Sequence, residues 1–276
     1  MVNRKELEPD ASPQAAFGDR LRTLRDARGW TQDELGERTG YSGTHISAVE
    51  TGRRSPTLPF SVSCDRALGT GDQLQRLSRA ARDTALIEGF PEYIAHEAKA
   101  AEIRLYEVGV IPGLLQTPEY AATLEADAVR RGEITSEQAD ERVEMVVRRQ
   151  AKLVRSPLPL ILVVLDEGCI RRTMGIPAVM DGQYKRLLEF AELPNTVLQV
   201  APFSMGARRP FSLPVTVLTL PDRSLMSYAE SVHRGRLERE SMVVLPLLTA
   251  YHQLQAEALS QADSAAMISK IRKGTT

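Results

Sequence analysis

The sequence has little cysteine and no long apolar run. Its two cysteines, Cys64 and Cys169, lie far apart and form no CxxC pair, so neither a zinc site nor a disulfide framework is predicted. The longest apolar run, LPLILVVL at residues 158–165, is too short to cross a bilayer as a helix. The N-terminal residues MVNRKELEPDASPQ contain no apolar core of a signal peptide. We therefore expect a soluble cytoplasmic protein.

The chain also lacks catalytic sequence motifs. No GxSxG, HExxH, GxGxxG or Walker phosphate-loop pattern occurs, and the histidines have no metal-ligand spacing. Asp166 and Glu167 are adjacent acids at the end of a predicted strand, where neighbouring side chains point to opposite faces and would not share a site. We therefore expect no enzymatic activity, no cofactor and no metal site.

There is no excess of charge of either sign. The chain has 35 Lys and Arg against 36 Asp and Glu, a formal net charge of −1. A near-neutral chain is not expected to coat nucleic acid non-specifically, so any DNA binding must come from a small local surface.

The 276 residues are enough for two domains. The pattern predicts a flexible N-terminus at 1–14, an all-α domain of five helices at 15–85, and an α+β domain at 86–276. The fourth helix is expected at 57–68 and the fifth at 72–89, where it also connects to the rest of the chain. The fourth helix is expected to close the core of the first domain with Leu58, Val62 and Leu68.

Two short helices joined by a glycine turn stand out in the first domain. Thr31 and Glu34 form a capping box that starts one helix, and Gly40 suits its left-handed C-terminal position. Ser42 is the predicted N-cap of the next helix, which buries Ile46. Such a pair is typical of a helix-turn-helix, and the alternative is an ordinary helical hairpin in a bundle.

The string TQDELGERTGYSGTHISAVETGRRSP resembles the phage-repressor type of helix-turn-helix, also called the xenobiotic-response-element family. Both its Thr-Gln start and its Ile-Ser-x-x-Glu-x-Gly-x-x-x-Pro run are present. The matching positions are Thr31, Gln32, Ile46, Ser47, Glu50, Gly52 and Pro56. The resemblance implies a sequence-specific DNA-binding domain whose third helix enters the major groove by its N-terminal turn.

The side chains expected on that helix are suited to reading base edges. Hydroxyl groups donate or accept hydrogen bonds, and methyl groups contact a thymine methyl. Gln32 resembles the family residue that binds phosphate, and Arg53 and Arg54 are expected to do the same, unless they are only a solvated pair. The predicted DNA contacts are Gln32, Ser42, Thr44, His45, Ser47, Ala48, Arg53 and Arg54.

The first domain carries little net positive charge for a DNA-binding module. Residues 17–66 hold eight basic and seven acidic side chains, a net charge of +1. Affinity for phosphates grows with the number of neutralised charges, so one copy is expected to bind weakly. We therefore expect a homodimer on double-stranded operator DNA.

The second domain is predicted from alternating helical and extended patterns. Ile94, Ala98, Ala101 and Leu105 recur at helical spacing and predict a helix over 93–107. Two helices follow, at PEYAATLEADAVRRG and at TSEQADERVEMVVRRQAKLV, and the second opens with a capping box of Thr135 and Gln138. A strand is then expected at LPLILVVL, a helix at 178–192, and three strands at NTVLQVAP, LPVTVLTL and LMSYAE, the last two forming a hairpin through PDRS. Residues 240–273 are expected to be helical. This order is typical of an α+β domain.

Five stretches of the chain together resemble one family: EAKAAEIRLYEVGVIPGLLQTPEY, VVRRQ, LDEGCIRR, LQVAPFSMG and ALSQADSAAMISKI. It is the large family of actinobacterial regulators that join a phage-repressor helix-turn-helix to an antitoxin-like regulatory domain, the type of the sporulation regulator WhiJ. The resemblance covers roughly residues 15–273. It implies a C-terminal domain that senses a small-molecule effector or, alternatively, binds a small partner protein.

The stretch IPGLLQTPEY at 111–120 has two interpretations. It is either a purely structural turn with a buried leucine pair and a new helix capped by Thr117, or it borders an apolar cleft with a few polar groups. In the second case PFSMGARRPF at 202–211 is a candidate lid. The predicted effector-binding residues are Tyr106, Gln116, Tyr120, Phe203 and Phe211.

Overall fold

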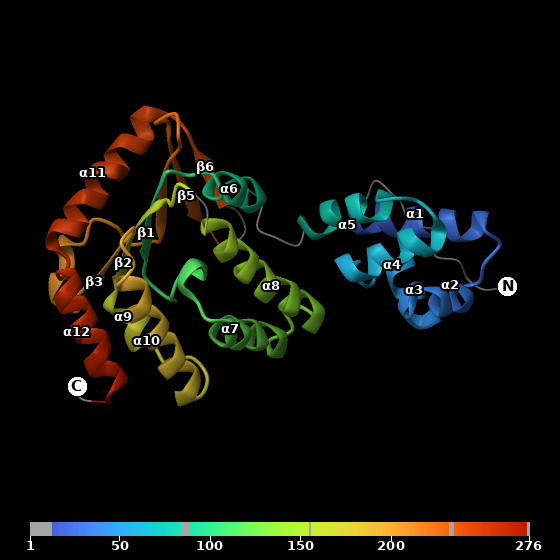
Figure 1. Cartoon of the computed structure of the whole chain (residues 1–276), viewed down its shortest axis with the longest axis horizontal. Helices are drawn as coiled ribbons and strands as arrows, with labels where there is room; N and C mark the ends of the chain where they lie inside the picture. The colour runs from blue at the N-terminus through green and yellow to red at the C-terminus, as the bar shows by residue number, and fades with distance from the viewer. Residues whose placement is uncertain (1–12, 84–88, 155, 232–234, 275–276) are drawn as a thin grey trace. The chain divides into compact units, whose positions relative to one another are not determined.

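A computed structural model describes residues 13–83, 89–154, 156–231 and 235–274. The chain divides into two units, Met1–Ile87 and Glu88–Thr276 (Figure 1). Each unit has its own hydrophobic core. The predicted boundary between residues 85 and 86, most of the predicted N-terminal tail and the end of the predicted fifth helix lie outside the described residues.

The described part of the N-terminal unit consists of five helices, as the sequence predicts. They are α1 (Pro13–Ala27), α2 (Gln32–Thr39), α3 (Gly43–Glu50), α4 (Leu58–Leu68) and α5 (Gln73–Asp83). The predicted capping box of α2 is present: the Thr31 hydroxyl accepts from the Glu34 amide at 3.2 Å, and the Glu34 carboxylate accepts from the Thr31 amide at 2.7 Å. Gly40 ends α2 in the left-handed region with φ of 80°.

The fourth helix faces the core differently from the prediction. Leu58 is 38% exposed and Val62 is only half-buried, whereas Phe60, Cys64 and Leu68 are buried. The reason is the position of the buried stripe: Phe60, Cys64 and Leu68 follow one another at i, i+4 spacing, and positions 58 and 62 lie outside this stripe. The buried core of this unit consists of Phe17, Leu21, Leu35, Ile46, Val49, Phe60, Cys64, Leu68 and Leu74.

The C-terminal unit is built on a six-stranded mixed sheet with the order β3-β2-β1-β4-β5-β6. β1, β2 and β3 are parallel, and β4, β5 and β6 are antiparallel to their neighbours. The strands are β1 (Glu102–Glu107), β2 (Leu160–Asp166), β3 (Thr196–Ala201), β4 (Val215–Thr219), β5 (Leu225–Glu230) and β6 (Gly235–Glu238). The predicted hairpin between β4 and β5 is confirmed, and β6 was not predicted.

The predicted helix over 93–107 is wrong. The structure has a shorter helix, α6 (Phe90–Glu97), and then β1, which lies inside the sheet between β2 and β4. Ile103 and Leu105 are buried on one face of β1 and Tyr106 on the other, which is the alternation of a strand with two buried faces. The helical spacing of residues 94, 98, 101 and 105 is coincidental, because Ile94 belongs to α6, Leu105 belongs to β1, and residues 98 and 101 lie between the two elements.

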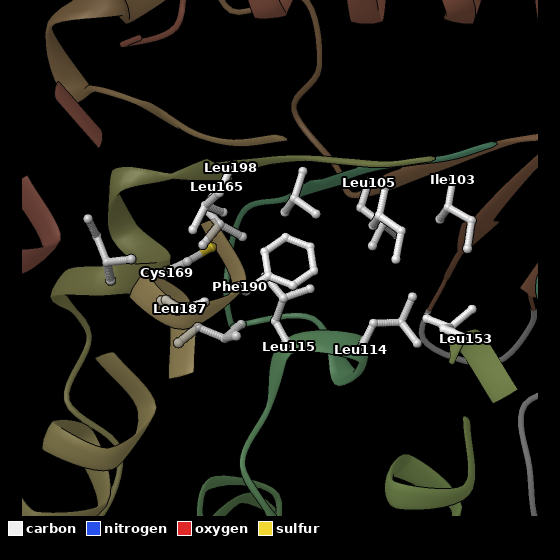
Figure 2. Packing of buried hydrophobic residues seen from close by; sticks show 14 of the residues in the cluster. Ile103, Leu105, Leu114, Leu115, Leu153, Leu165, Cys169, Leu187, Phe190 and Leu198 are labelled. Atoms are coloured by element: carbon white, nitrogen blue, oxygen red, sulfur yellow. The ribbon is translucent and has the colours of Figure 1, made fainter. Parts of the chain in front are cut away.

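Helices cover both faces of the sheet. One face carries η2 (Gly113–Leu115), α7 (Pro118–Arg130), α8 (Ser136–Leu153), α9 (Glu167–Arg171), α10 (Pro177–Ala191) and α12 (Gln261–Arg272), together with α6. The other face is covered by α11 (Ser241–Glu257) and by η3 (Phe203–Arg208). Figure 2 shows Leu114, Leu115 and Phe190 pointing from the first helical layer toward strand residues such as Leu105. Among the described helices, none is both long and apolar enough to span a bilayer.

Candidate nucleic-acid interface and effector site

The third helix has one buried face and one outward face. Ile46, Val49 and Glu50 are buried, while Thr44 is exposed and Ser47 and Ala48 are half-buried. Positions 44, 47 and 48 follow the i, i+3, i+4 spacing of one helix face. The structure therefore brings the three predicted base-reading side chains together on one short, uncharged stripe.

Close backbone approach fixes the turn between α2 and α3. A Cβ on Gly36 would lie 2.6 Å from the Tyr41 carbonyl oxygen, and one on Gly43 would lie 1.8 Å from an Asp33 carboxylate oxygen. Side chains at these two positions would push the helices apart. Ser42 lies in this turn, and its hydroxyl accepts a hydrogen bond from the His45 amide at 3.2 Å, so it caps α3 as predicted.

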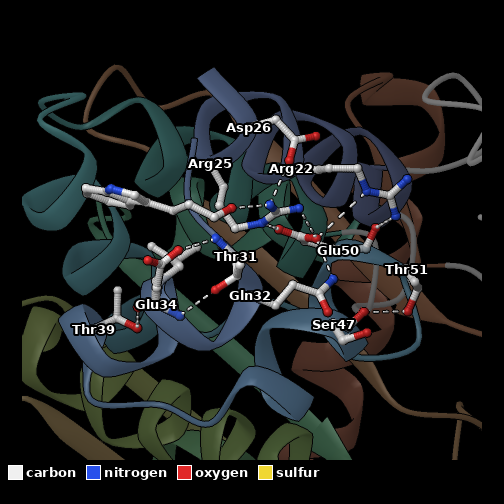
Figure 3. Close-up of polar contacts among 12 residues, drawn as sticks. Arg22, Arg25, Asp26, Thr31, Gln32, Glu34, Thr39, Ser47, Glu50 and Thr51 are labelled. Atoms are coloured by element: carbon white, nitrogen blue, oxygen red, sulfur yellow. Dashed lines mark hydrogen bonds and ion pairs between the residues drawn. The ribbon is translucent and has the colours of Figure 1, made fainter. Parts of the chain in front are cut away.

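A buried carboxylate holds α3 against the two preceding helices (Figure 3). Glu50 is fully buried, and both its oxygens accept from Arg25, at 2.6 Å from Nε and 3.0 Å from Nη2. The Gln32 amide donates to the same carboxylate at 2.8 Å, and Arg22 donates to the Glu50 carbonyl at 3.0 Å. The network ties α1, α2 and α3 together and fixes the orientation of α3. Hydrogen bonding with Glu50 raises the pKa of Arg25 above its ordinary value, so Arg25 stays charged.

Two predicted DNA contacts have internal partners. Gln32 was expected at a phosphate, and its side-chain NH₂ donates instead to Glu50. His45 lies on the inner side of the helix start, with its ring centroid 4.7 Å from that of Tyr41 and 4.9 Å from that of Phe60. Burial, and then the charge of Arg54, lower the pKa of His45, which favours the neutral ring.

The two arginines after α3 differ in exposure. Arg53 is exposed, and its Nε donates to the Thr51 hydroxyl at 2.9 Å, whereas Arg54 is half-buried. The Thr51 hydroxyl in turn donates to the Ser47 carbonyl at 2.7 Å. Arg53 is therefore attached to the end of α3 with its guanidinium open to solvent. Among the described residues, no cluster of His, Cys, Asp or Glu is arranged to hold a metal ion.

The predicted effector residues do not line one cleft. Tyr106 and Phe211 meet on the face of the sheet covered by α11, with ring centroids 5.8 Å apart. Tyr120 lies in the cluster on the opposite face, and Gln116 belongs to the same buried segment as Leu114 and Leu115. Phe203 is 59% exposed. The sheet separates the two groups because Tyr106 points away from the face of Ile103 and Leu105.

The 111–117 elbow is held by side-chain amides from three directions. Gln116 Nε2 donates to the Ile111 carbonyl at 2.7 Å, and the Ile111 amide donates to the Tyr120 hydroxyl at 3.3 Å. Gln150 Nε2 donates to the carbonyls of Gly113 and Gln116, at 2.7 and 2.8 Å. Gln183 accepts from the Thr117 amide and donates to the Leu115 carbonyl, both at 2.8 Å.

Sequence reasoning missed an ion pair next to this elbow. Arg149 pairs with buried Glu97 of α6, and its guanidinium lies over the rings of Phe90 and Tyr93, 5.1 and 5.8 Å from the centroids. The Tyr93 hydroxyl donates to Glu97 at 2.5 Å. Burial, and then the Glu97 charge, raise the pKa of Tyr93 well above its ordinary value. The only signal in the sequence was that Glu97 and the Arg149-Gln150 pair belong to the stretches that carry the family resemblance.

The 202–211 segment is fastened at the carboxyl ends of the parallel strands. Asp166, the last residue of β2, pairs with Arg209 at 2.5 Å, and Glu167 accepts from the Phe203 amide at 2.7 Å. The expectation that these two acids point to opposite faces is wrong, because the strand ends at Asp166 and a helix begins at Glu167. Both carboxylates hold the same segment, whose Met205 is buried.

Tyr106 and Glu107 end β1 beside this segment. Burial raises the pKa of the Tyr106 hydroxyl to about 12, although the nearby Arg209 charge opposes the shift. Burial, and then the carboxylate of Glu230, raise the pKa of Glu107 to about 8. The carboxyl edge of the parallel strands, where open α/β sheets bind ligands, therefore holds groups that are costly to ionise.

Comparison with known proteins gives matches for both units. The family described as a helix-turn-helix domain (HTH_31) matches residues 16–77, and the domain of unknown function DUF5753 matches residues 90–270. Over 52 residues the chain is 38% identical to the uncharacterized HTH-type transcriptional regulator y4dJ of Sinorhizobium fredii, a match covering 19% of this chain and 68% of that protein. No solved structure matches the chain. The chain therefore belongs to the DUF5753 family, and its N-terminal unit is a DNA-binding helix-turn-helix domain of the kind found in transcriptional regulators.

Proposed function

We propose that the protein is a sequence-specific transcriptional regulator that binds a pseudo-palindromic operator as a homodimer. Its C-terminal unit, which resembles the regulatory domain of the actinobacterial regulators of the WhiJ type, binds a small-molecule effector and thereby changes operator affinity. The observation that carries the DNA-binding part is the outward stripe of Thr44, Ser47 and Ala48 on a helix held in place by buried Glu50.

Each part of the stripe has a distinct expected role. Thr44, Ser47 and Ala48 contact base edges, because hydroxyl and methyl groups suit the major groove. Arg53 and Arg54 contact phosphates and set orientation without reading sequence. Ser42 and Gln32 lie at helix starts, where backbone amides also favour phosphate. His45 supports the helix start from inside, through Tyr41 and Phe60.

The test separates base reading from phosphate contact on an operator selected from random DNA. Thr44→Ala is expected to weaken binding to the selected operator by ~1–3 kcal/mol and to leave non-specific binding unchanged. Arg53→Ala is expected to weaken binding to all sequences alike and to reduce the slope of log affinity against log salt by ~0.9. Thr23→Ala, an exposed threonine of α1, is the matched control. Equal losses on specific and random DNA for Thr44→Ala would contradict the assignment.

The effector site is proposed on the α11 face of the sheet, at Tyr106 and Phe211 under the 202–211 segment. The supporting observation is that aromatic side chains, the Arg209 guanidinium and a segment fastened by two carboxylates meet at the carboxyl ends of parallel strands. Gln116 and Tyr120 lie on the other face and are tied to the Ile111 backbone, so we assign them to the elbow.

A metabolite library screened by thermal shift tests this site. A ligand at a hundred times its Kd stabilises the folded state by ~2.7 kcal/mol. We expect Phe211→Ala to abolish the shift given by a hit, and Tyr120→Phe to retain it. A hit that also releases operator DNA from the wild type supports the sensing role. A shift that survives Phe211→Ala would place the ligand elsewhere, and binding of a small partner protein would then be the competing function.

A further inference from the structure

The helix α11 has an inner face and an outer face of unusual composition. Val244, Tyr251 and Leu254 are buried against the sheet, and the Tyr251 hydroxyl donates to the Leu162 carbonyl at 2.8 Å. On the outer side Met242 is 85% exposed and Leu245 is 49% exposed. The adjacent Val243 is 45% exposed. The first two turns therefore present large apolar side chains to solvent.

No charged side chain interrupts this outer face. From Ser241 to Ala256 the sequence contains no Asp, Glu, Lys or Arg, although such residues make up 26% of the chain. The outward positions at helical spacing are Met242, Leu245, Pro246, Thr249 and Gln253. A helix that faces water normally carries charged or polar residues on this side. Contiguous exposed apolar side chains are typical of an interaction surface.

We propose that the outer stripe of α11, formed by Met242, Leu245, Pro246 and Thr249, is the surface through which two copies of this chain form a homodimer. In this dimer α11 of one copy packs antiparallel against α11 of the other across a two-fold axis. The inference rests on the proposed function, in which the regulator binds DNA as a dimer, and it names the surface that makes the dimer.

The absence of charge favours a second copy as the occupant. In a two-fold contact the same surface patch of each copy faces the other, so a charged residue near the axis lies close to the same residue of the partner, and the two like charges repel each other. A stripe without charges avoids this repulsion and buries no unpaired ion. A different protein would usually be selected through complementary charges, and the stripe offers none.

Two charged residues at the ends of the helix already have partners within the same chain. Glu257 pairs with Arg208 at 2.6 Å, and Arg239 pairs with Glu92 at 2.5 Å. These two side chains are therefore already paired and do not offer a charge for binding a different protein. The DNA-binding unit supplies the need for a second copy, because its net charge of +1 over residues 17–66 predicts weak binding by one copy.

The test measures molar mass by sedimentation equilibrium for the full chain and two variants. The wild type is expected to be a dimer and Leu245→Glu a monomer. The Leu245→Glu monomer should still unfold cooperatively in urea, which would show that the substitution disrupts assembly and not folding. Ile176→Glu is the matched control, since Ile176 is an exposed apolar residue outside α11 and its substitution should leave the dimer intact. A monomeric wild type, or a Leu245→Glu variant that stays dimeric, overturns the proposal.

Thiol crosslinking gives a second readout that does not depend on loss of assembly. Cys64 and Cys169 are buried, so a thiol introduced at exposed Thr249 is the reactive one. A short bis-maleimide should join two Thr249→Cys chains and should not join two Thr23→Cys chains. Failure to crosslink Thr249→Cys in a dimeric sample would place the interface elsewhere. Operator binding by a monomeric wild type that depends on Thr44 would retain sequence-specific DNA binding and would reject both the proposed homodimer and its α11 interface.

Discussion

Arg149 and Glu97 form a bidentate ion pair that joins α8 to α6. Arg149 Nε donates to one carboxylate oxygen at 3.0 Å and Nη2 to the other at 2.8 Å, and the Glu97 side chain is almost fully buried. The next residue, Gln150, holds the two carbonyls of the elbow. Two consecutive residues of α8 thus fix α6 on one side and the 111–117 elbow on the other.

The ion pair should be important for stability. Glu97→Gln leaves the Arg149 charge buried without its counter-ion, so we expect the free energy of unfolding to fall by ~3–5 kcal/mol in urea denaturation. Glu144→Gln is the matched control on the same helix, because its pair with Arg148 is exposed and should be worth less than ~1 kcal/mol. Equal effects of the two substitutions would show that water or another carboxylate compensates the Arg149 charge when Glu97 no longer carries a negative charge.

The elbow should respond to loss of a single amide. Gln150→Leu keeps much of the side-chain volume but removes the donor for the Gly113 and Gln116 carbonyls, so we expect a loss of ~1–3 kcal/mol in unfolding free energy. Tyr120→Phe removes one longer hydrogen bond and should cost ~0.5–1.5 kcal/mol. Lys152→Leu, at an exposed position of α8, controls for added apolar surface.

These values also test the two interpretations of the IPGLLQTPEY stretch. If the elbow is only structural, Gln116→Ala and Tyr120→Phe lower stability and leave effector-induced release of DNA unchanged. The hydrogen bonds of both side chains to Ile111 favour this outcome. Altered release at unchanged stability would support the regulatory interpretation.

The helix-turn-helix requires glycine at position 36, because the backbone at Tyr41 lies too close to leave room for a side chain there. Gly36→Ala places a Cβ 2.6 Å from the Tyr41 carbonyl oxygen, which is backbone and cannot rotate away. We expect a loss of ~1–3 kcal/mol in the stability of the N-terminal unit, measured by circular dichroism of the full chain in urea. Gly182→Ala is the control, with the opposite expected effect on stability. Gly182 lies inside α10 with no atom near its Cβ position, so alanine there should stabilise the C-terminal unit by ~0.5–1 kcal/mol.

Local features of the fold could be predicted from the sequence. The capping boxes at Thr31 and Thr135 are set by residues three positions apart, and both are present. The strand at LPLILVVL was predicted because a continuous β-branched run is typical of a strand buried on both faces. In such cases the determining residues lie within one turn or one strand of each other.

Features that depend on distant partners could not be predicted. Glu97 and Arg149 are 52 residues apart, and no periodicity relates them. The alternation of Ile103, Leu105 and Tyr106 identifies β1 only once its neighbours β2 and β4 are known. Without that pairing, the sequence could not show that the sheet separates Tyr106 from Tyr120. The predicted effector site therefore combined residues that lie on opposite faces of the sheet.

The stability of the protein should also depend on pH through Glu107. Folding raises the pKa of this carboxyl from its ordinary 4.5 to about 8, chiefly through burial. Between these values the folded state binds a proton that the unfolded state has released, so stability should fall as the pH rises and then level off above about pH 8. Glu107→Gln removes the titrating group and should flatten this part of the profile.

The comparison of urea denaturation at pH 5 and pH 9 isolates this contribution. One pKa unit corresponds to ~1.4 kcal/mol, so we expect Glu107→Gln to be more stable than the wild type by at least ~1 kcal/mol at pH 9, with little difference at pH 5. Glu192→Gln, at an exposed position after α10, should show no such pH-dependent difference. If Glu107→Gln matched the wild type at both pH values, the carboxyl would be solvated in the folded protein, and the carboxyl edge of the strands would be open to water rather than closed.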